Sequence, residues 1–284
     1  MPSGSLLTSI ADARLLDELT KIVARAAAAI LAISPAALDP RIKPDRSPVT
    51  TADETAEAVI LEGLERLLPG MPVVSEEAAS YPDLLPSAFV LVDPLDGTRE
   101  FIAGKPEFTV NVALIADQRP VLGVVAGPAT DTIWRGIVGK GAERLILVAG
   151  EEPRALAPTA IRTRSARRER LVVTLSRSHL DPTTESFLGR LPVGERRILG
   201  SSAKFCLVAE GSADVYPRLS PTCEWDIAAG HAVLTAAGGV VTGPNGEPIV
   251  YGQAQQGFRV PAFVAWGDGK AARRLLGKSA SRSD

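Results

Sequence analysis

Two closely spaced carboxylates follow an apolar run near the middle of the sequence. Residues 88–101 read AFVLVDPLDGTREF, so Asp93 and Asp96 come directly after a predicted buried strand over residues 89–92. An unpaired charge at the end of a buried strand is very unfavourable, whereas a hard divalent cation with oxygen ligands would neutralise both side chains. A proline and a glycine beside the two aspartates predict a tight turn. The segment is therefore predicted to be a metal-binding turn.

Two further acidic side chains stand at comparable places in the sequence. Glu76 follows a short predicted strand over residues 72–74, and Asp226 begins a predicted apolar helix over residues 225–237. Each alone fits a surface charge or a helix-dipole partner. Four converging carboxylates would repel one another and bind protons unless cations neutralised them. The set therefore predicts Mg²⁺, more than one ion, with the carbonyl of Leu95 as a further oxygen ligand.

A fifth carboxylate, Asp53, lies at the start of another predicted helix. Apolar spacing predicts this helix over residues 52–68, where Thr51 and Glu54 fit a capping box and Gly70 fits the end. Asp53 then lies in the first turn, where a carboxylate compensates the helix dipole. From these residues alone, this structural role is the favoured interpretation.

The first half of the chain combines helices with a predicted sheet. Residues 6–33 have the spacing of an amphipathic helix, and four apolar runs between residues 108 and 148 alternate with turn-rich separators. These runs predict an antiparallel meander, so residues 1–150 are expected to form an α+β half that carries the metal site. The arginine-rich segment 150–170 favours a solvated connection between halves, with a basic rim that attracts an anionic substrate as the alternative.

The second half alternates predicted strands and helices. Strands are expected over residues 171–175, around 196–199 and over 215–218, and helices over 182–190 and 225–237. Residues 200–211 read as a turn, a serine cap and a short helix. This alternation argues for an α/β layer. Residues 151–284 are therefore expected to form an α/β half that contributes Asp226 and recognises the substrate.

The composition is that of a soluble globular protein. The 284 residues are 45% hydrophobic and 23% charged, and the net charge of -2 gives no reason to expect nucleic-acid or membrane binding. The most apolar early run, residues 22–33, is shorter than the roughly 20 residues of a membrane span. Cys206 and Cys223 form no disulfide or zinc motif, so a cytoplasmic location is expected.

Four motifs together resemble those of the inositol monophosphatase superfamily. They are VTTAD at 49–53, SEE at 75–77, DPLDGT at 93–98 and WDIAAGH at 225–231. The resemblance runs from about Leu15 to Phe263 and implies the five-layer αβαβα sandwich, a layered α/β fold, of these Mg²⁺-dependent, lithium-sensitive phosphomonoesterases.

Within this superfamily, three further motifs are most similar to those of bacterial 3'(2'),5'-bisphosphate nucleotidases. They are SRSH at 176–179, GSSAKFCLVAEG at 200–211 and YPR at 216–218. This similarity implies hydrolysis of the 3'-phosphate of adenosine 3',5'-bisphosphate in sulfur assimilation or nucleotide recycling. A small phosphorylated nucleotide is then the expected partner, and 3'-phosphoadenylyl sulfate is a further candidate substrate.

The resemblance also implies a role for each site residue. Glu76, Asp93 and the Leu95 carbonyl would hold one Mg²⁺, and Asp93, Asp96 and Asp226 would hold the second; two or three ions per site are expected. Thr98 and Asp53 match a pair that activates the attacking water, so the structural interpretation of Asp53 gives way, and Glu76 completes the catalytic set. The implied substrate-binding residues are Gly97, Thr98, His179, Ser201, Lys204, Arg218 and Asp226.

Several alternatives stay open at this point. An inositol-1-monophosphatase or a fructose-1,6-bisphosphatase could use the same metal site, and a catalytically inactive nucleotide-binding regulator is a third candidate. Lys204 and Arg218 could be surface charges. His231 is expected to be a packed core residue, and Trp225 is expected to pack so that it fixes the neighbouring aspartate. A homodimer and a peripheral membrane association are left open.

Overall fold

The computed structural model describes residues 11–34, 37–43, 47–78, 84–150, 152–166 and 169–280. The first residues of the helix predicted from Leu6 lie outside the described residues. In the described part of the chain, no helix combines the length and the apolar character needed to cross a membrane.

A seven-stranded sheet is the scaffold of the first half. Its strands lie in the order β3, β4, β5, β6, β7, β8 and β9, and neighbours are antiparallel except for β3 and β4, which are parallel. The bounds are β3 Val73–Ser75, β4 Ala88–Asp96, β5 Thr109–Ala116, β6 Arg119–Gly127, β7 Thr132–Ile137, β8 Gly141–Val148 and β9 Arg154–Ile161. The predicted antiparallel meander is confirmed.

Strand β9 corrects the prediction of a solvated connection over residues 150–170. Residues Arg154–Ile161 pair antiparallel with β8 and form one edge of the seven-stranded sheet. Most of the side chains of β9 are exposed, so the strand lacks the apolar alternation by which a half-buried strand is recognised. The chain therefore stays in the first sheet until Ile161, and the division into halves at residue 150 stays a prediction.

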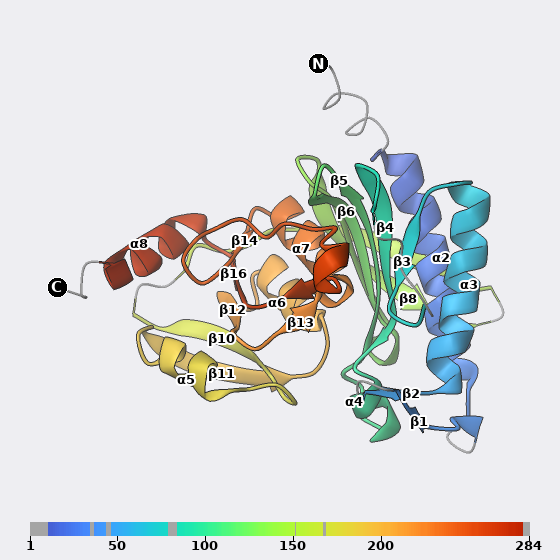
Figure 1. The fold of residues 1–284 in the computed structure, drawn as a ribbon, viewed down its shortest axis with the longest axis horizontal. Helices are drawn as coiled ribbons and strands as arrows, with labels where there is room; N and C mark the ends of the chain where they lie inside the picture. Colours follow the sequence, from blue (N-terminus) through green and yellow to red (C-terminus); the bar gives the residue numbers. More distant parts are fainter. Residues whose placement is uncertain are drawn as a thin grey trace.

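Helices cover both faces of this sheet (Figure 1). Helices α2 (Ala13–Ala32) and α3 (Thr51–Leu67) pack on one face, and α6 (Ala203–Ala209) and α7 (Glu224–Ala236) pack on the other. The strands are apolar on both sides because each face is buried in its own hydrophobic core.

A five-stranded sheet lies beyond α6 and α7. Its order is β11 (Val193–Leu199), β10 (Leu171–Ser176), β12 (Val215–Arg218), β16 (Phe263–Trp266) and β14 (Val240–Thr242), with β10 parallel to both of its neighbours. Helices α5 (Pro182–Leu188) and α8 (Gly269–Ala280) cover the far face, where Leu188 and Ala272 join a third core. The layers run αβαβα, which confirms the predicted five-layer sandwich.

Short elements connect these layers near the ends of the strands. The pairs are β1 (Arg41–Ile42) with β2 (Pro48–Val49) and β13 (Thr222–Cys223) with β15 (Arg259–Val260). Helix α4 (Thr98–Ile102) follows β4 directly, and two single turns are η2 (Pro128–Thr130) and η3 (Ala254–Gln256). Strand β13 leads straight into α7, which places the start of that helix at the strand ends.

The start of α3 lies one residue earlier than predicted. Thr50, not Thr51, is the N-cap: its backbone is extended, and its hydroxyl oxygen accepts from the N–H of Ala52 at 3.1 Å. The reciprocal partner of this capping box is Asp53, whose Oδ2 accepts from the Thr50 N–H at 2.8 Å. The prediction of Thr51 and Glu54 was wrong because two adjacent threonines both have the right chemistry for a cap.

Replacing Gly123 with alanine should destabilise the packing of α7 on the sheet. A Cβ added to Gly123 in β6 would lie 2.4 Å from the backbone oxygen of Ala229 in α7, and two backbones cannot separate without disturbing the core. We expect a loss of about 1–3 kcal/mol in the free energy of unfolding, measured by urea denaturation. Gly189→Ala is the control, because its added Cβ would lie 3.4 Å from the nearest atom and its φ is -60°. Equal stability of both variants would contradict the account.

Candidate active site

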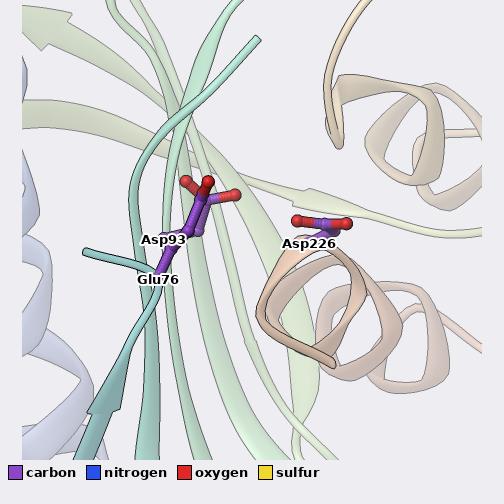
Figure 2. A group of neighbouring side chains, drawn as sticks. All are labelled: Glu76, Asp93 and Asp226. Atoms are coloured by element: carbon purple, nitrogen blue, oxygen red, sulfur yellow. The ribbon is translucent and has the colours of Figure 1, made fainter. Parts of the chain in front are cut away.

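Three carboxylates converge where strands β3 and β4 end beside the start of helix α7 (Figure 2). Glu76, Asp93 and Asp226 each offer one oxygen, and these oxygens lie within 4.8 Å of one another. Glu76 follows β3 and donates its backbone N–H to the Val92 carbonyl of the parallel strand β4 at 3.1 Å. Glu76 and Asp93 lie together on the strand side, and Asp226 faces them from the start of α7. The structure therefore brings together three of the four carboxylates that were predicted to converge, and the fourth, Asp96, is outside this group but lines the same cavity as Glu76 and Asp226.

An irregular end to β4 sets the positions of Asp93 and Asp96. The strand was predicted to end at Val92, but it continues to Asp96 with a break in its pairing to β5 between the two aspartates. Gly97 follows with φ +97°, and a Cβ there would lie 2.9 Å from the Glu107 carbonyl oxygen. Only glycine fits this close approach without strain.

The Leu95 carbonyl lies inside this turn. Its oxygen lies 3.1 Å from the Thr98 hydroxyl, and the Leu95 N–H donates to the Asp93 carboxylate at 3.1 Å. Leu95 is also one of the residues that line the cavity in front of the carboxylates. Its predicted role as a metal ligand stays a prediction.

Burial and the charges of neighbouring carboxylates raise the pKa values of Glu76, Asp93 and Asp96. Burial raises the pKa of Glu76 to about 8, with Asp226 adding to the rise and Lys43 opposing it. The pKa of Asp93 lies well above its usual range because of burial and then the charge of Glu76. Burial and Asp226 raise the pKa of Asp96 to about 7. Each group would release its proton readily only if a cation shared the site.

The orphaned oxygen of Asp93 fits a cation ligand. Asp93 is fully buried, and its Oδ2 has no hydrogen-bond partner in the described part of the chain. In Asp226, Oδ2 accepts from the Thr222 hydroxyl and from the Cys223 N–H, the latter at 2.9 Å. Asp226 therefore caps α7 with one oxygen, and its other oxygen is left for a metal. The donor set is all oxygen, which suits Mg²⁺.

Asp53 reaches the site through Thr98. The Thr98 hydroxyl lies 2.9 Å from Asp53 Oδ1, while Thr50 donates to Oδ2 from both its N–H and its hydroxyl, at 2.8 and 2.7 Å. Burial raises the pKa of Asp53, and these hydrogen bonds oppose the rise. A threonine that donates to a fixed carboxylate keeps its oxygen as an acceptor for a water molecule. The structure thus brings together the predicted pair.

Lys43 is a site residue that the sequence did not reveal. Its ammonium group lies 2.8 Å from a carboxylate oxygen of Glu76 and 2.8 Å from one of Glu77. Burial lowers the pKa of Lys43, but Glu76 and Glu77 raise it more. The segment around Lys43 reads as a polar loop with no distinguishing pattern, so no signal in the sequence points to this contact.

The cavity in front of the carboxylates also carries positive charge. The cavity has a volume of about 440 Å³ and is lined by the carboxylates Glu76, Asp96 and Asp226, by the turn residues Gly97 and Thr98, and by Arg99, His179, Ser201, Lys204 and Arg218. All of the predicted substrate-binding residues therefore border one cavity. Arg99 was not predicted, although it directly follows the Asp96 turn.

Lys204 and Arg218 are not ordinary surface charges. Lys204 is 2% exposed, and its ammonium donates to the carbonyls of Leu199, at 3.3 Å, and Ser201. Burial lowers the pKa of Lys204 to about 8, and the charge of Arg218 adds to this while Asp96 opposes it. The Nε atom of Arg218 is buried and has no partner among the described residues. Burial and then the charge of Arg218 also lower the pKa of His179.

The remaining candidates behave as packing residues. His231 contacts the Tyr251 hydroxyl through Nδ1 at 2.9 Å, and burial lowers the pKa of His231 to about 3. Trp225 is 8% exposed and lies with its ring 5.9 Å from that of Phe258. These positions agree with the predicted packing roles. A serine cap was predicted for the short helix within residues 200–211. Ser202 is the N-cap residue of α6, but its side chain makes no capping bond, because its hydroxyl has other partners.

Comparisons with known proteins agree with this architecture. Residues 13–279 match the sequence pattern of the inositol monophosphatase family. The chain is 40% identical over 257 residues, 88% of this chain and 100% of the relative, to the 3'(2'),5'-bisphosphate nucleotidase CysQ of Escherichia coli O157:H7. It is 33% identical over 266 residues, 88% of this chain and 94% of the relative, to a histidinol-phosphatase of Mycobacterium tuberculosis.

Solved structures show the same similarity. The crystal structure of CysQ from Bacteroides thetaiotaomicron superposes with a TM-score of 0.74 at 34% identity, covering 90% of this chain and 98% of that chain. The inositol monophosphatase from Anabaena superposes with a TM-score of 0.72 at 24% identity, covering 94% and 96% of the two chains. The second likeness shows the fold.

The metal-free protein should lose stability as the pH rises from about 5 to about 8. In this range the unfolded chain has released the proton of Glu76, at an ordinary pKa of 4.5, while the folded protein keeps it up to a pKa of about 8. Folding then requires extra proton binding, which becomes harder as the pH rises. Thermal unfolding in EDTA should show the fall in Tm, and Glu76→Gln should reduce it. A Tm that rises over this pH range would contradict the account.

Proposed function

Because the chain belongs to the inositol monophosphatase family, we propose that it is a Mg²⁺-dependent phosphomonoesterase that acts on adenosine 3',5'-bisphosphate. The reaction hydrolyses the 3'-phosphate ester and yields AMP and inorganic phosphate. The named activity of the relative that is 40% identical over its entire length supports this substrate. A place in sulfur assimilation or nucleotide recycling, a cytoplasmic location and a homodimer stay predictions.

The observation that carries this proposal is that one cavity is lined by both carboxylates and buried cations. Glu76, Asp96 and Asp226 are called the carboxylate wall here, and Lys204 and Arg218 are called the cationic wall. A monophosphate needs only the metal side. A substrate with a second phosphate uses both walls. Buried charges are unfavourable without an opposite charge nearby, so the buried cations favour a bound anion and the carboxylates favour a bound cation. This arrangement favours a bisphosphate.

The carboxylates would hold the metal ions, as their fit to an oxygen-ligand site indicates. Glu76, Asp93 and the Leu95 carbonyl would hold one Mg²⁺, and Asp93, Asp96 and Asp226 would hold a second. Bound Mg²⁺ supplies electrostatic stabilisation and lowers the pKa of water.

The remaining residues prepare the reactants. Thr98, held by Asp53, orients the attacking water by accepting a hydrogen bond from it, and the backbone N–H groups of Gly97 and Thr98 would donate to an oxygen of the scissile phosphate. Arg218 and Lys204 neutralise the second phosphate, and Ser201 and His179 border the nucleoside. Hydrolysis needs no covalent enzyme intermediate. Neither cysteine is a suitable nucleophile, because burial keeps both thiols protonated: it raises the pKa of Cys223 to about 12 and that of Cys206 well above its usual range.

Phosphate release from a substrate panel tests the proposal. The panel comprises adenosine 3',5'-bisphosphate, adenosine 3'-monophosphate, inositol 1-phosphate, fructose 1,6-bisphosphate and histidinol phosphate, each with Mg²⁺, with EDTA and with added Li⁺. We expect kcat/KM for the nucleotide bisphosphate to exceed those of the monophosphates by about 10²-fold, because only a bisphosphate pairs with both walls, and we expect Li⁺ to inhibit. Fructose 1,6-bisphosphate should also be cleaved more slowly, because it lacks the nucleoside that Ser201 and His179 border. Faster cleavage of inositol 1-phosphate or fructose 1,6-bisphosphate would identify the alternative enzymes. Binding without Mg²⁺-dependent release would instead identify an inactive regulator.

Asp96→Asn should abolish turnover and leave the protein folded. Asparagine keeps the shape of the side chain but removes the charge that holds a cation, so kcat should fall by about 10³-fold or more. Removing one of the repelling carboxylates should leave the Tm in EDTA unchanged or higher. The control is Asp131→Asn, at an exposed turn where φ is +48° and asparagine fits equally well. Near-normal turnover by folded Asp96→Asn would remove Asp96 from the metal site.

A further inference from the structure

A buried chain of polar side chains connects the two halves beside the site. The Ser202 hydroxyl donates to Asn111 Oδ1 at 2.6 Å and lies 2.8 Å from the Thr109 hydroxyl. All three residues are nearly inaccessible, at 1–2% exposure. Because Ser202 has a single hydroxyl proton and gives it to Asn111, Thr109 must be the donor to Ser202. The chain therefore has a defined direction from Thr109 through Ser202 to Asn111.

The partners of Ser202 stand directly opposite two predicted metal ligands. In the pairing of β4 with β5, Thr109 faces Asp96 and Asn111 faces Asp93. The backbone N–H of Ser202 also interacts with the Asp96 carboxylate and favours its charged form. Ser202 is thus attached to the strand pair at the two positions where that pair presents its carboxylates.

On its other side, Ser202 continues into the cationic wall of the cavity. Ser202 precedes α6, whose second residue is Lys204. A second attachment lies just before it, where the Gly200 N–H donates to Glu107 Oε2 at 2.9 Å and a Cβ on Gly200 would lie 2.6 Å from the Glu107 carbonyl oxygen. The segment 200–204 is therefore fixed to the first half at both Gly200 and Ser202.

The hydroxyl of Ser202 is not explained by the needs of α6. A serine at the start of a helix ordinarily caps it, but Ser202 has a helical backbone conformation and makes no capping bond. Both of its side-chain hydrogen bonds go to β5, 91 and 93 residues away in the sequence. Its contribution is to the contact between the halves.

We propose that Ser202 is a positioning residue that fixes the distance between the carboxylate wall and the cationic wall of the cavity. This inference rests on the proposed function, since a fixed distance matters most to a substrate that carries two phosphates. Without the hydroxyl, segment 200–204 can shift relative to β4, and the N–H that faces Asp96 shifts with it. The site then binds both Mg²⁺ and a bisphosphate less well, while a monophosphate is less affected.

The test compares Ser202→Ala and Thr109→Val with the control Thr132→Val. Thr132, the first residue of β7, is 3% exposed, and its hydroxyl donates one hydrogen bond, to the Thr130 carbonyl at 2.7 Å, so it matches the loss of a buried hydroxyl outside the site. The first readout is the Mg²⁺ concentration that gives half of the Mg²⁺-induced rise in Tm. We expect it to increase about tenfold in Ser202→Ala, as for other groups that orient metal ligands, and to increase less in Thr109→Val. It should not change in Thr132→Val.

The second readout separates positioning from general loss of structure. In Ser202→Ala, KM for adenosine 3',5'-bisphosphate should rise about tenfold more than KM for adenosine 3'-monophosphate. Thr132→Val should lower the Tm and leave both KM values unchanged. Thr109→Val gives the same comparison if Ser202→Ala does not fold.

Two outcomes would overturn the role of Ser202. In the first outcome, Ser202→Ala has the same half-saturating Mg²⁺ concentration as Thr132→Val, and the same ratio of KM for the bisphosphate to KM for the monophosphate. In the second outcome, the Tm of the wild-type protein does not respond to Mg²⁺. If the wild type responds to Mg²⁺ but releases no phosphate from the bisphosphate, the proposed function fails. In that case, the half-saturating Mg²⁺ concentrations of the variants still decide the role of Ser202.

Discussion

Repulsion among buried carboxylates is the constraint on which this structure depends. Asp93 is fully buried, and Glu76, Asp96 and Asp226 add to the negative charge around it. Burial penalises the charges of Glu76, Asp93 and Asp96, and the neighbouring carboxylates penalise them again. Lys43 opposes this effect by forming an ion pair with Glu76. The fold therefore forms a site that is either protonated or occupied by cations, and a cation at the site would stabilise the fold as well as serve the chemistry.

The backbone supplies the geometry that this site needs. Parallel pairing of β3 with β4 puts Glu76 beside Asp93, and the irregular end of β4 turns Asp96 into the cavity. On the other face, Gly123 lets α7 approach the sheet closely enough for Asp226 to complete the cluster. The hydrophobic cores on both faces hold these elements rigidly, so the carboxylates cannot separate to relieve their repulsion.

The sequence predicted the residues that terminate regular elements better than those that connect distant segments. Asp93 and Asp226 were recognisable because each follows or begins an apolar run, and the five-layer fold followed from the motif resemblance. The contacts of Lys43 with Glu76 and of Ser202 with Asn111 span 33 and 91 residues. Such contacts depend on how the layers pack against one another, and a local sequence pattern does not predict that packing. Strand β9 was missed because its exposed side chains remove the alternation that marks a strand.

The most direct test of the central claim is to count the protons released when Mg²⁺ binds. Titration calorimetry at about pH 7 in two buffers of different ionisation enthalpy gives this number, because metal binding to a protonated carboxylate must release the proton. With the pKa of Glu76 at about 8 and that of Asp96 at about 7, the account predicts release of about one proton or more per site. Mg²⁺ binding without proton release would show that the carboxylates are already charged in the free protein, and would contradict the account.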